Sequence, residues 1–332
     1  MGVLKLGPRE RLSPMSVMRI IAGLVMAIGL VVAGPAGGGA RQAAAAAAPK
    51  LTGVDYEVTY SAFDSRSPKH SVATCPAGKV VLGGGSDILP GGPDAPAPHV
   101  TLTQMEPYRT GNGRYEYSVR ASETAPGTSK DWILSAYAIC ADPVSGYEIK
   151  NSVTPMSSAS VQATAATCST GKRVLGTGAR INFPIFIDPD GHPYDDPHGI
   201  GLQVQRADAL GVLTRAQAHE RPSGYSLNWQ LLAFAVCGTE PQGYVVKYAE
   251  SEDRLSETFK IAGLWCPGDR NVLNSGGAIS NIAPGNATLY ALPPAPSQDG
   301  KRLIGAVAAA YENTPTSANW DFIVAQAICA DK

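Results

Sequence analysis

Charged side chains are scarce in this 332-residue sequence: 17% of the residues are Asp, Glu, Lys or Arg, against about 25% in an average globular protein. The 27 basic and 28 acidic residues leave a formal net charge of -1, so the sequence lacks the basic excess that a nucleic-acid-binding protein needs. By contrast, 44% of the residues are hydrophobic, which excludes a largely disordered chain. The composition therefore favours a folded protein that does not bind nucleic acid.

The common catalytic motifs are also missing. The sequence contains no G-x-S-x-G, no H-E-x-x-H, no phosphate-binding loop and no dinucleotide-binding glycine pattern. It has five histidines, and none of them occupies the same place in the repeat described below as another. We therefore predict a protein that is not an enzyme and that needs no cofactor, with bound calcium as the one exception considered below.

The longest apolar run lies near the N-terminus, at residues 20–32. At about 13 residues it is shorter than the roughly 20 that a membrane-spanning helix needs. Basic residues precede it, and an alanine-rich stretch with several A-x-A sites follows at 40–48, which is the pattern of a secretory signal. We predict that residues 1–48 are a signal segment and that the mature protein is secreted, extracellular and without a transmembrane span. An uncleaved membrane anchor is the alternative.

Six cysteines reveal a threefold internal repeat. They form three successive pairs separated by 65, 69 and 63 residues, namely Cys75 and Cys140, Cys168 and Cys237, and Cys266 and Cys329. The first cysteines begin the similar segments CPAGKVVLGGGSDI, CSTGKRVLGTGARI and CPGDRNVLNSGGAI, and the second cysteines end DWILSAYAIC, NWQLLAFAVC and NWDFIVAQAIC. A tyrosine opens each repeat: Tyr56, Tyr147 and Tyr244. We therefore divide the chain into unit 1 (56–146), unit 2 (147–243) and unit 3 (244–332).

Each unit is predicted to consist of antiparallel β-strands. The segments that end on a cysteine are apolar at both parities, as in a strand buried on both faces, and further strands are expected at 100–105, 115–122, 212–219 and 303–311. The glycine clusters at 83–85 and 276–277 predict β-bulges or close backbone approach. Trp320 lies one residue farther from its cysteine than Trp132 and Trp229 do, which predicts a β-bulge in the last strand.

In an oxidising compartment, the cysteines are expected to form three disulfides. The repeat leaves two pairings open. Pairing within units joins Cys75–Cys140, Cys168–Cys237 and Cys266–Cys329, whereas pairing between units joins Cys140–Cys168, Cys237–Cys266 and Cys75–Cys329. We expect the first, because each unit then carries its own cross-link. A thiol nucleophile or a metal cluster is disfavoured, since all six positions follow the repeat and no C-x-x-C occurs.

The motif C-P-A-G-K-x-V-L-G-G-G, followed by W-x-L-x-A-x-A-x-C, resembles a repeat of secreted actinobacterial proteins. Similar single copies occur at the tips of phage-like and collagen-like trimeric fibres. The resemblance covers most of 56–332, and unit 3 departs from it at Asp269 and Asn274. It implies extracellular β-structure and no named activity.

If single copies form trimers, three fused copies are expected to form a monomer with an internal pseudo-trimer. The expected fold is therefore all-β, with three antiparallel repeats around a pseudo-threefold axis, similar to a β-prism. It also resembles, distantly, the vitelline-membrane outer-layer proteins. The alternative is three tandem β-sandwiches of the immunoglobulin kind, although a sandwich would carry its tryptophan on an earlier strand.

One carboxylate recurs in every unit, 17 residues before the second cysteine. Near a threefold axis, three carboxylates would repel one another unless they were paired, hydrated or bridged by a cation. They are therefore candidates for a repeated sugar or cation site, the alternative being that each one ends a strand or caps a turn. The three residues are Glu123, Glu220 and Glu312.

Aromatic side chains are the second group of candidates, because exposed tryptophans and tyrosines stack on sugar rings. The recurring Trp132, Trp229 and Trp320 are predicted to serve packing instead. The residues expected to contact a ligand are Trp265, Tyr108 and Tyr194.

An acidic insertion in unit 2, IFIDPDGHPYDDPHG at 185–199, is the third candidate. Calcium prefers several oxygen ligands from a flexible loop, although the closing Glu of an EF-hand is missing. His192 and His198 leave a transition-metal site as an alternative, and a solvated loop without a metal as another. The candidate calcium ligands are Asp188, Asp190, Asp195 and Asp196.

Two hypotheses for the function follow. The first is a secreted, lectin-like protein that binds a cell-wall or extracellular glycan or another cell-surface polymer through repeated loops, where weak sites gain from multivalency. The second is a structural or interaction protein of the cell envelope or spore surface, without a small-molecule ligand. Aromatic residues gathered in a cleft would favour the first, and a large flat apolar face would favour the second.

Overall fold

The computed structural model describes residues 47–90, 99–124, 126–183, 185–187, 193–195, 199–251, 258–280, 285–312 and 320–332. These residues form strands and turns and belong to one compact body, and no helix occurs among them. The all-β prediction is confirmed. No helix of the described ranges is therefore long and apolar enough to cross a membrane.

The strands of unit 1 are β1 (Asp55–Tyr60), β2 (Lys69–Thr74), β3 (Val80–Pro90), β4 (Val100–Arg109), β5 (Tyr115–Glu123) and β6 (Trp132–Ala141). Those of unit 2 are β7 (Glu148–Val153), β8 (Val161–Thr167), β9 (Lys172–Asn182), β10 (Ile185–Ile187), β11 (Pro193–Asp195), β12 (Ile200–Ala207), β13 (Leu213–Glu220) and β14 (Gln230–Thr239). Those of unit 3 are β15 (Val245–Glu250), β16 (Phe259–Trp265), β17 (Asn271–Ile279), β18 (Ala287–Ala291), β19 (Pro294–Pro296), β20 (Leu303–Glu312) and β21 (Ile323–Ala330).

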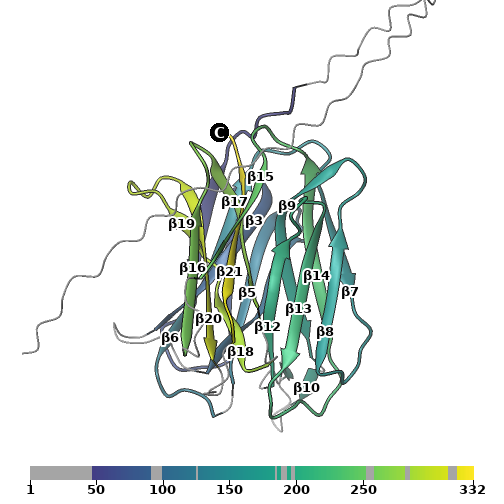
Figure 1. Ribbon diagram of the computed structural model, residues 1–332, viewed down its shortest axis with the longest axis vertical. Helices are drawn as coiled ribbons and strands as arrows, with labels where there is room; N and C mark the ends of the chain where they lie inside the picture. The colour runs from purple at the N-terminus through teal and green to yellow at the C-terminus, as the bar shows by residue number, and fades with distance from the viewer. Residues whose placement is uncertain are drawn as a thin grey trace, which may run out of the picture. The chain divides into compact units, whose positions relative to one another are not determined.

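The six long strands of each unit are hydrogen-bonded in the same order. Unit 1 has the orders β1-β6-β3 and β2-β5-β4, unit 2 has β7-β14-β9 and β8-β13-β12, and unit 3 has β15-β21-β17 and β16-β20-β18. Figure 1 shows β8, β13 and β12 side by side. All pairings are antiparallel, and β10 and β11 form a separate hairpin. The repeat of the sequence is therefore also a repeat of strand order.

Sheets cross the boundaries between units. Strand β4 pairs with β9 and β12 pairs with β17, which creates two six-stranded sheets, β2-β5-β4-β9-β14-β7 and β15-β21-β17-β12-β13-β8. The sheets β1-β6-β3 and β16-β20-β18 remain separate, with β19 beside β20. The described strands thus form four main sheets, where three equivalent ones were expected.

The fourth sheet arises because the junction between units 3 and 1 is short. The N–H of Ser86 in β3 donates to the carbonyl of Leu292 at 3.3 Å, and the N–H of Leu292 donates back to Ser86 at 2.7 Å. Pro293 and Pro294 follow Leu292 and have no N–H, so the ladder cannot continue in that direction. The two hydrogen bonds alone do not merge β3 and the end of β18 into one sheet.

A β-bulge recurs at the aligned leucine of each unit. The register shifts past Leu82 in β3, past Leu175 in β9 and past Leu273 in β17, and all three leucines are fully buried. A bulge adds a residue to one strand and bends it. The prediction of bulges or close backbone approach at the glycine clusters is confirmed, by a bulge that adjoins Gly83 and by close approach at Gly276, where a Cβ would lie 2.8 Å from the carbonyl oxygen of Gln205.

The predicted bulge in the last strand is wrong. The pairing of β21 with β15 runs without a shift, and the shift between β17 and β21 lies in β17. The extra residue lies in the turn before β21, where Asp321 has a left-handed backbone with φ of 57°. This conformation turns the chain so that Trp320 is fully buried, as Trp132 and Trp229 are, while the ladder stays intact.

Asn274 lies where the three units meet. Its Oδ1 accepts the backbone N–H groups of Gly84 in unit 1 and Thr177 in unit 2, both at 3.2 Å. Its Nδ2 donates to the hydroxyl of Thr177 at 2.8 Å and to the carbonyl of Ser275 at 2.9 Å. Units 1 and 2 have a glycine at this position, Gly83 and Gly176. Unit 3 has Asn274 instead, and its fully buried amide links all three units.

The disulfides join cysteines within units, as predicted. The pairs are Cys75–Cys140, Cys168–Cys237 and Cys266–Cys329, with Cα–Cα distances of 5.8, 5.7 and 5.9 Å. No cysteine is free.

Candidate functional site

In units 1 and 2, the recurring carboxylate binds the recurring tryptophan. Glu123, Glu220 and Glu312 are the last residues of β5, β13 and β20. The indole N–H of Trp132 donates to Glu123 at 3.3 Å and that of Trp229 donates to Glu220 at 3.0 Å. The second oxygen of each carboxylate accepts a backbone N–H of the following turn. In units 1 and 2, the carboxylate therefore ends its strand and holds a tryptophan and a turn of its own unit.

A second polar column contacts the same tryptophans, and sequence reasoning missed it. Lys69, Gln162 and Lys260 occupy equivalent positions in β2, β8 and β16, and all three are buried. The ammonium of Lys69 lies 4.8 Å from the ring centroid of Trp132, and that of Lys260 lies 4.6 Å from that of Trp320. A single lysine in a short strand is usually exposed. In the ladders, Lys69 lies opposite Ala121 in β5 and Lys260 lies opposite Ala310 in β20. Burial of the two lysines follows from this pairing, which the sequence alone does not show.

Lys69 also carries its own counter-ion. It donates to the carbonyl of Ala62 at 2.9 Å and forms an ion pair with Asp64. Lys69 and Arg66, which both bind the carboxylate, hold the pKa of Asp64 well below its ordinary value. These contacts satisfy the buried ammonium, so the cluster stabilises the tryptophan and leaves no reactive group free.

The three aromatic candidates are not brought together. Trp265 is 64% exposed at the end of β16, and Ile261 lies on the same face of that strand. Tyr108 is half-buried in β4, where burial and the neighbouring Glu116, which accepts its hydroxyl, raise its pKa to about 12. The side chain of Tyr194, on β11, lies outside the described residues. Trp265 and Tyr108 thus belong to different sheets.

The candidate calcium ligands cannot be placed. Asp188, Asp190 and Asp196 lie outside the described residues, and for Asp195 the backbone alone is described, at the end of β11. In the part of the chain that the structure describes, no group of three or more His, Cys, Asp or Glu side chains could hold a metal. Calcium binding at 185–199 stays a prediction.

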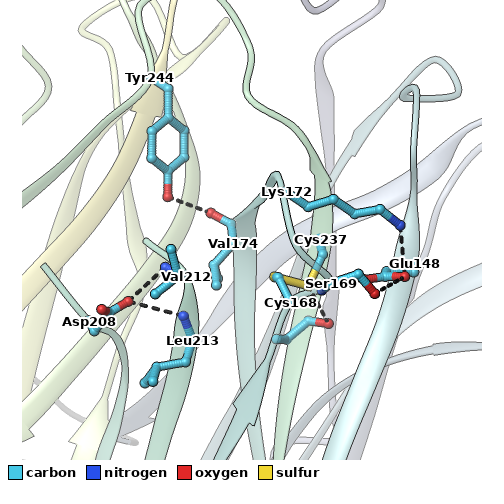
Figure 2. The surroundings of a disulfide bond; sticks show 11 residues. Glu148, Cys168, Ser169, Lys172, Val174, Asp208, Val212, Leu213, Cys237 and Tyr244 are labelled. Atoms are coloured by element: carbon cyan, nitrogen blue, oxygen red, sulfur yellow. Dashed lines mark hydrogen bonds and ion pairs between the residues drawn. A yellow bond between two sulfur atoms is a disulfide. The ribbon is translucent and has the colours of Figure 1, made fainter. Parts of the chain in front are cut away.

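Tyrosines fill two of the three contacts between consecutive units, which we call seams 1/2, 2/3 and 3/1. At seam 2/3, the hydroxyl of Tyr244 donates to the carbonyl of Val174 at 2.8 Å (Figure 2). At seam 1/2, Tyr147 donates to Val81 at 2.8 Å. Both tyrosines directly precede the first strand of their unit, and burial raises the pKa of both hydroxyls.

Tyr56 does not have this role. The expectation that Tyr56, Tyr147 and Tyr244 occupy equivalent positions is wrong for Tyr56. In the ladders, Asp55, Glu148 and Val245 each pair with the second cysteine of their unit. The residue before each of them is Val54 in unit 1, whereas it is a tyrosine in units 2 and 3. Tyr56 lies two residues farther along, and its hydroxyl donates to the carbonyl of Gly300 at 2.7 Å. Seam 3/1 therefore has a valine where the other seams have a tyrosine.

A cavity of about 290 Å³ lies at seam 3/1. Its apolar lining comes from the half-buried Val54 and Tyr56 and from four buried residues, Leu51, Ile139, Val272 and Leu303. Its basic lining comes from Lys301, Arg302 and Lys332, and Asp55 supplies the one side-chain carboxylate among the lining residues.

The basic residues around this seam cavity are only partly neutralised. Asp269 accepts Arg302 at 3.3 Å and Lys332 at 2.9 Å, and these two partners lower its pKa. Asp55 pairs with Lys79 at 3.8 Å. Lys301 makes no ion pair within the described ranges. The seam cavity thus combines an apolar interior with a basic opening, which suits a ligand with an apolar body and a negative charge.

No protein-family model matches the chain, and no curated protein is similar to it in sequence.

Proposed function

We propose that the chain is an exported, non-catalytic binding protein with a lectin-like role toward a cell-wall or extracellular glycan. The observation that carries this proposal is the exposure of Trp265. The other three tryptophans are fully buried, whereas Trp265 lies over Gly305 of the neighbouring strand β20 and leaves most of its surface in solvent. An exposed indole provides an apolar face on which a sugar ring stacks.

Polar groups near this strand could complete such a site. The turn after β16 carries Asp269, which binds Arg302 and Lys332. Carboxylates accept hydrogen bonds from hydroxyl groups, and guanidinium and ammonium groups donate to them. A glycan on Trp265 would therefore find both kinds of partner on unit 3.

Export is supported by the cysteines and by the N-terminal sequence. Three disulfides persist in oxidising compartments and are rare in the cytosol. Residues 1–48 have the pattern of a secretory signal. The proposed location is extracellular, in keeping with the resemblance to secreted actinobacterial repeats.

We also propose that the four sheets derive from a pseudo-threefold β-prism. Support comes from the junctions between units, where Met105 pairs with Ala179 and Gln205 pairs with Gly277. Counting from the first cysteines, Ala179 and Gly277 occupy the position of Ser86, whose partner is Leu292. All three junctions therefore use equivalent residues, and they differ in the length of the ladder.

Glycan binding is tested with a glycan array and a pull-down on purified cell-wall polysaccharide. Saturable binding that Trp265→Ala reduces at least about fivefold would support the proposal, since stacking on an aromatic ring contributes about 1 kcal/mol or more. Ile261→Ala, on the same face of β16, is the matched control and should retain binding. No retention of the unaltered protein on any polysaccharide would contradict the proposal.

A second candidate function is that of a structural or interaction protein of the cell envelope or spore surface. The observation that favours it is a run of exposed apolar side chains at the end of β1, namely Val58, Tyr60 and Phe63. Clusters of exposed apolar groups mark contact surfaces between proteins. Concentration-dependent self-association that Phe63→Ser abolishes, without binding to any glycan, would favour this second function.

A further inference from the structure

Seam 3/1 retains the hydrogen-bond acceptor but lacks the tyrosine that uses it elsewhere. Val81, Val174 and Val272 occupy equivalent positions, because each pairs with the second cysteine of its unit. The carbonyls of the first two accept a tyrosine hydroxyl. At Val272, the residue in place of the tyrosine is Val54, whose side chain has no hydroxyl. Both Val54 and Val272 line the seam cavity.

A second acceptor lies beside this carbonyl. Asn271 lines the seam cavity, and its Oδ1 is buried without a hydrogen-bond partner in the described part of the chain. A buried acceptor that has lost its contact with water costs free energy unless a donor reaches it. A ligand that brings a hydroxyl group into the cavity would therefore be favoured over one that is wholly apolar.

The opening of the cavity favours a negative charge on the other end of the ligand. Lys301, Arg302 and Lys332 line the opening; Arg302 and Lys332 pair with Asp269, and Asp55 pairs with Lys79. Lys301 is exposed and makes no ion pair within the described ranges. An anion at the opening would remain partly hydrated, so its binding would not be opposed by the full desolvation free energy of a buried charge.

We propose that the seam cavity binds a small phenolic acid, with its ring in the space that a tyrosine ring fills at the other two seams. The phenol hydroxyl donates to the carbonyl of Val272 or to Oδ1 of Asn271, and the carboxylate lies at the opening beside Lys301. The volume of about 290 Å³ is sufficient for one substituted ring, since a water molecule takes about 30 Å³. Arg302 and Lys332 border both this cavity and the polar group proposed beside Trp265, but Val54, Asn271 and Val272 belong to the cavity alone. Variants at Val54 and Trp265 therefore test the two proposals independently.

The first experiment is calorimetric titration of the disulfide-intact protein with 3-(4-hydroxyphenyl)propionate. Two analogues each lack one group: 3-phenylpropionate has no hydroxyl, and 4-ethylphenol has no carboxylate. We expect saturable binding of the phenolic acid at one site and weaker binding of each analogue by about fivefold or more, which corresponds to one lost hydrogen bond or charge contact. No saturable binding of the phenolic acid at millimolar concentration would overturn the proposal.

Variants then locate the site. Val54→Tyr should fill the cavity, abolish binding and raise the melting temperature, because it supplies the ring and hydroxyl found at the other seams. Tyr147→Phe, at seam 1/2, is the matched control and should bind the phenolic acid normally. Binding by Val54→Tyr at unaltered strength would overturn the proposal.

Lys301→Ala provides a test that does not depend on how Val54→Tyr folds, since Lys301 is exposed. It should weaken binding of the phenolic acid about fivefold while leaving binding of 4-ethylphenol unchanged. An equal loss for both compounds, or no loss for either, would contradict the placement of the carboxylate.

Discussion

At the scale of single residues, the molecule depends on buried tryptophans with polar partners. Trp132 contacts the ammonium of Lys69 on its ring and the carboxylate of Glu123 at its indole N–H. In unit 2, Gln162 replaces the lysine and donates to the carbonyl of Trp229 at 2.7 Å. A buried donor without an acceptor is costly, so the carboxylates are expected to serve stability.

Removing one carboxylate tests this assignment. Glu220→Ala leaves the buried indole N–H of Trp229 and the backbone N–H of Tyr225 without their acceptor, and should lower the free energy of unfolding by about 1–3 kcal/mol. Urea unfolding followed by tryptophan fluorescence measures the loss. Glu240→Ala is the control, because Glu240 forms an exposed ion pair with Arg173, which contributes about 0–1 kcal/mol. Equal losses in the two variants would contradict a structural role specific to Glu220.

A buried histidine predicts a dependence of stability on pH. Burial of His219 in β13 lowers its pKa from 6.5 to about 4, and its Nδ1 has no hydrogen-bond partner in the described ranges. The fold therefore favours the neutral ring. Its contribution to stability is complete above the unfolded pKa and is lost as the pH falls from 6.5 toward 4.

Between pH 7.5 and pH 5, this one group should cost about 2 kcal/mol of stability. Urea unfolding at the two pH values measures the change. His219→Gln cannot become charged, so its stability should fall less over the same interval. If the variant and the unaltered protein lose the same amount, His219 does not cause the dependence.

At the scale of elements, the bulges are the feature that brings the units into contact. A Cβ at Gly176, next to the bulge at Leu175, would lie 2.0 Å from the backbone carbonyl oxygen of Leu82 in unit 1. A Cβ at Gly83 would likewise lie 2.5 Å from the carbonyl oxygen of Leu273 in unit 3. The bulged strands therefore approach one another more closely than any side chain would permit.

Gly176→Ala is accordingly expected to be strongly destabilising, by about 2–4 kcal/mol, because the clash is with backbone atoms that cannot rotate away. Gly263→Ala is the control, since a Cβ in that strand, β16, would meet its nearest atoms at ordinary distances of 3.7 and 3.8 Å. Thermal unfolding followed by circular dichroism compares the two. A melting temperature for Gly176→Ala that equals that of Gly263→Ala would contradict the close approach.

At the scale of the whole molecule, the units share both sheets and core. Two sheets cross unit boundaries, and Asn274 binds groups of all three units. Asn274→Ala would leave the N–H groups of Gly84 and Thr177 buried without an acceptor. We expect a loss of about 2–5 kcal/mol of unfolding free energy, measured by urea unfolding. A loss below about 1 kcal/mol would show that Asn274 does not hold the units together.

Shared sheets also predict cooperative unfolding. Calorimetry of the whole protein should show a single transition, because no unit buries its apolar surface alone. The isolated fragment 50–146 would expose β3 and the edge of β4 that pairs with β9, so it should be unstable or trimerise. A stable monomeric fragment, together with three separate transitions in the intact protein, would instead indicate three independent domains.

Much of this architecture could be predicted from the sequence, because it depends on spacing along the chain. The cysteine separations and the repeated flanking residues predicted the all-β class and the disulfides within units. Apolar residues at both parities predicted the buried strands that contain Cys140 and Cys237. Each of these features lies within a single unit, so the repeat displays it three times.

The tertiary structure alone decided the features that depend on pairing between distant segments. Tyr56 matches Tyr147 and Tyr244 by eye, yet the ladder with β6 places Val54 at the equivalent position. The burial of Lys69 and Lys260 and the role of Asn274 likewise follow from which strands lie opposite them. A shift of one or two residues in register changes the partner of every side chain, and hydrogen bonds across the sheet determine that register. The seam cavity is a consequence of this kind, since it exists where the register puts a valine in place of a tyrosine.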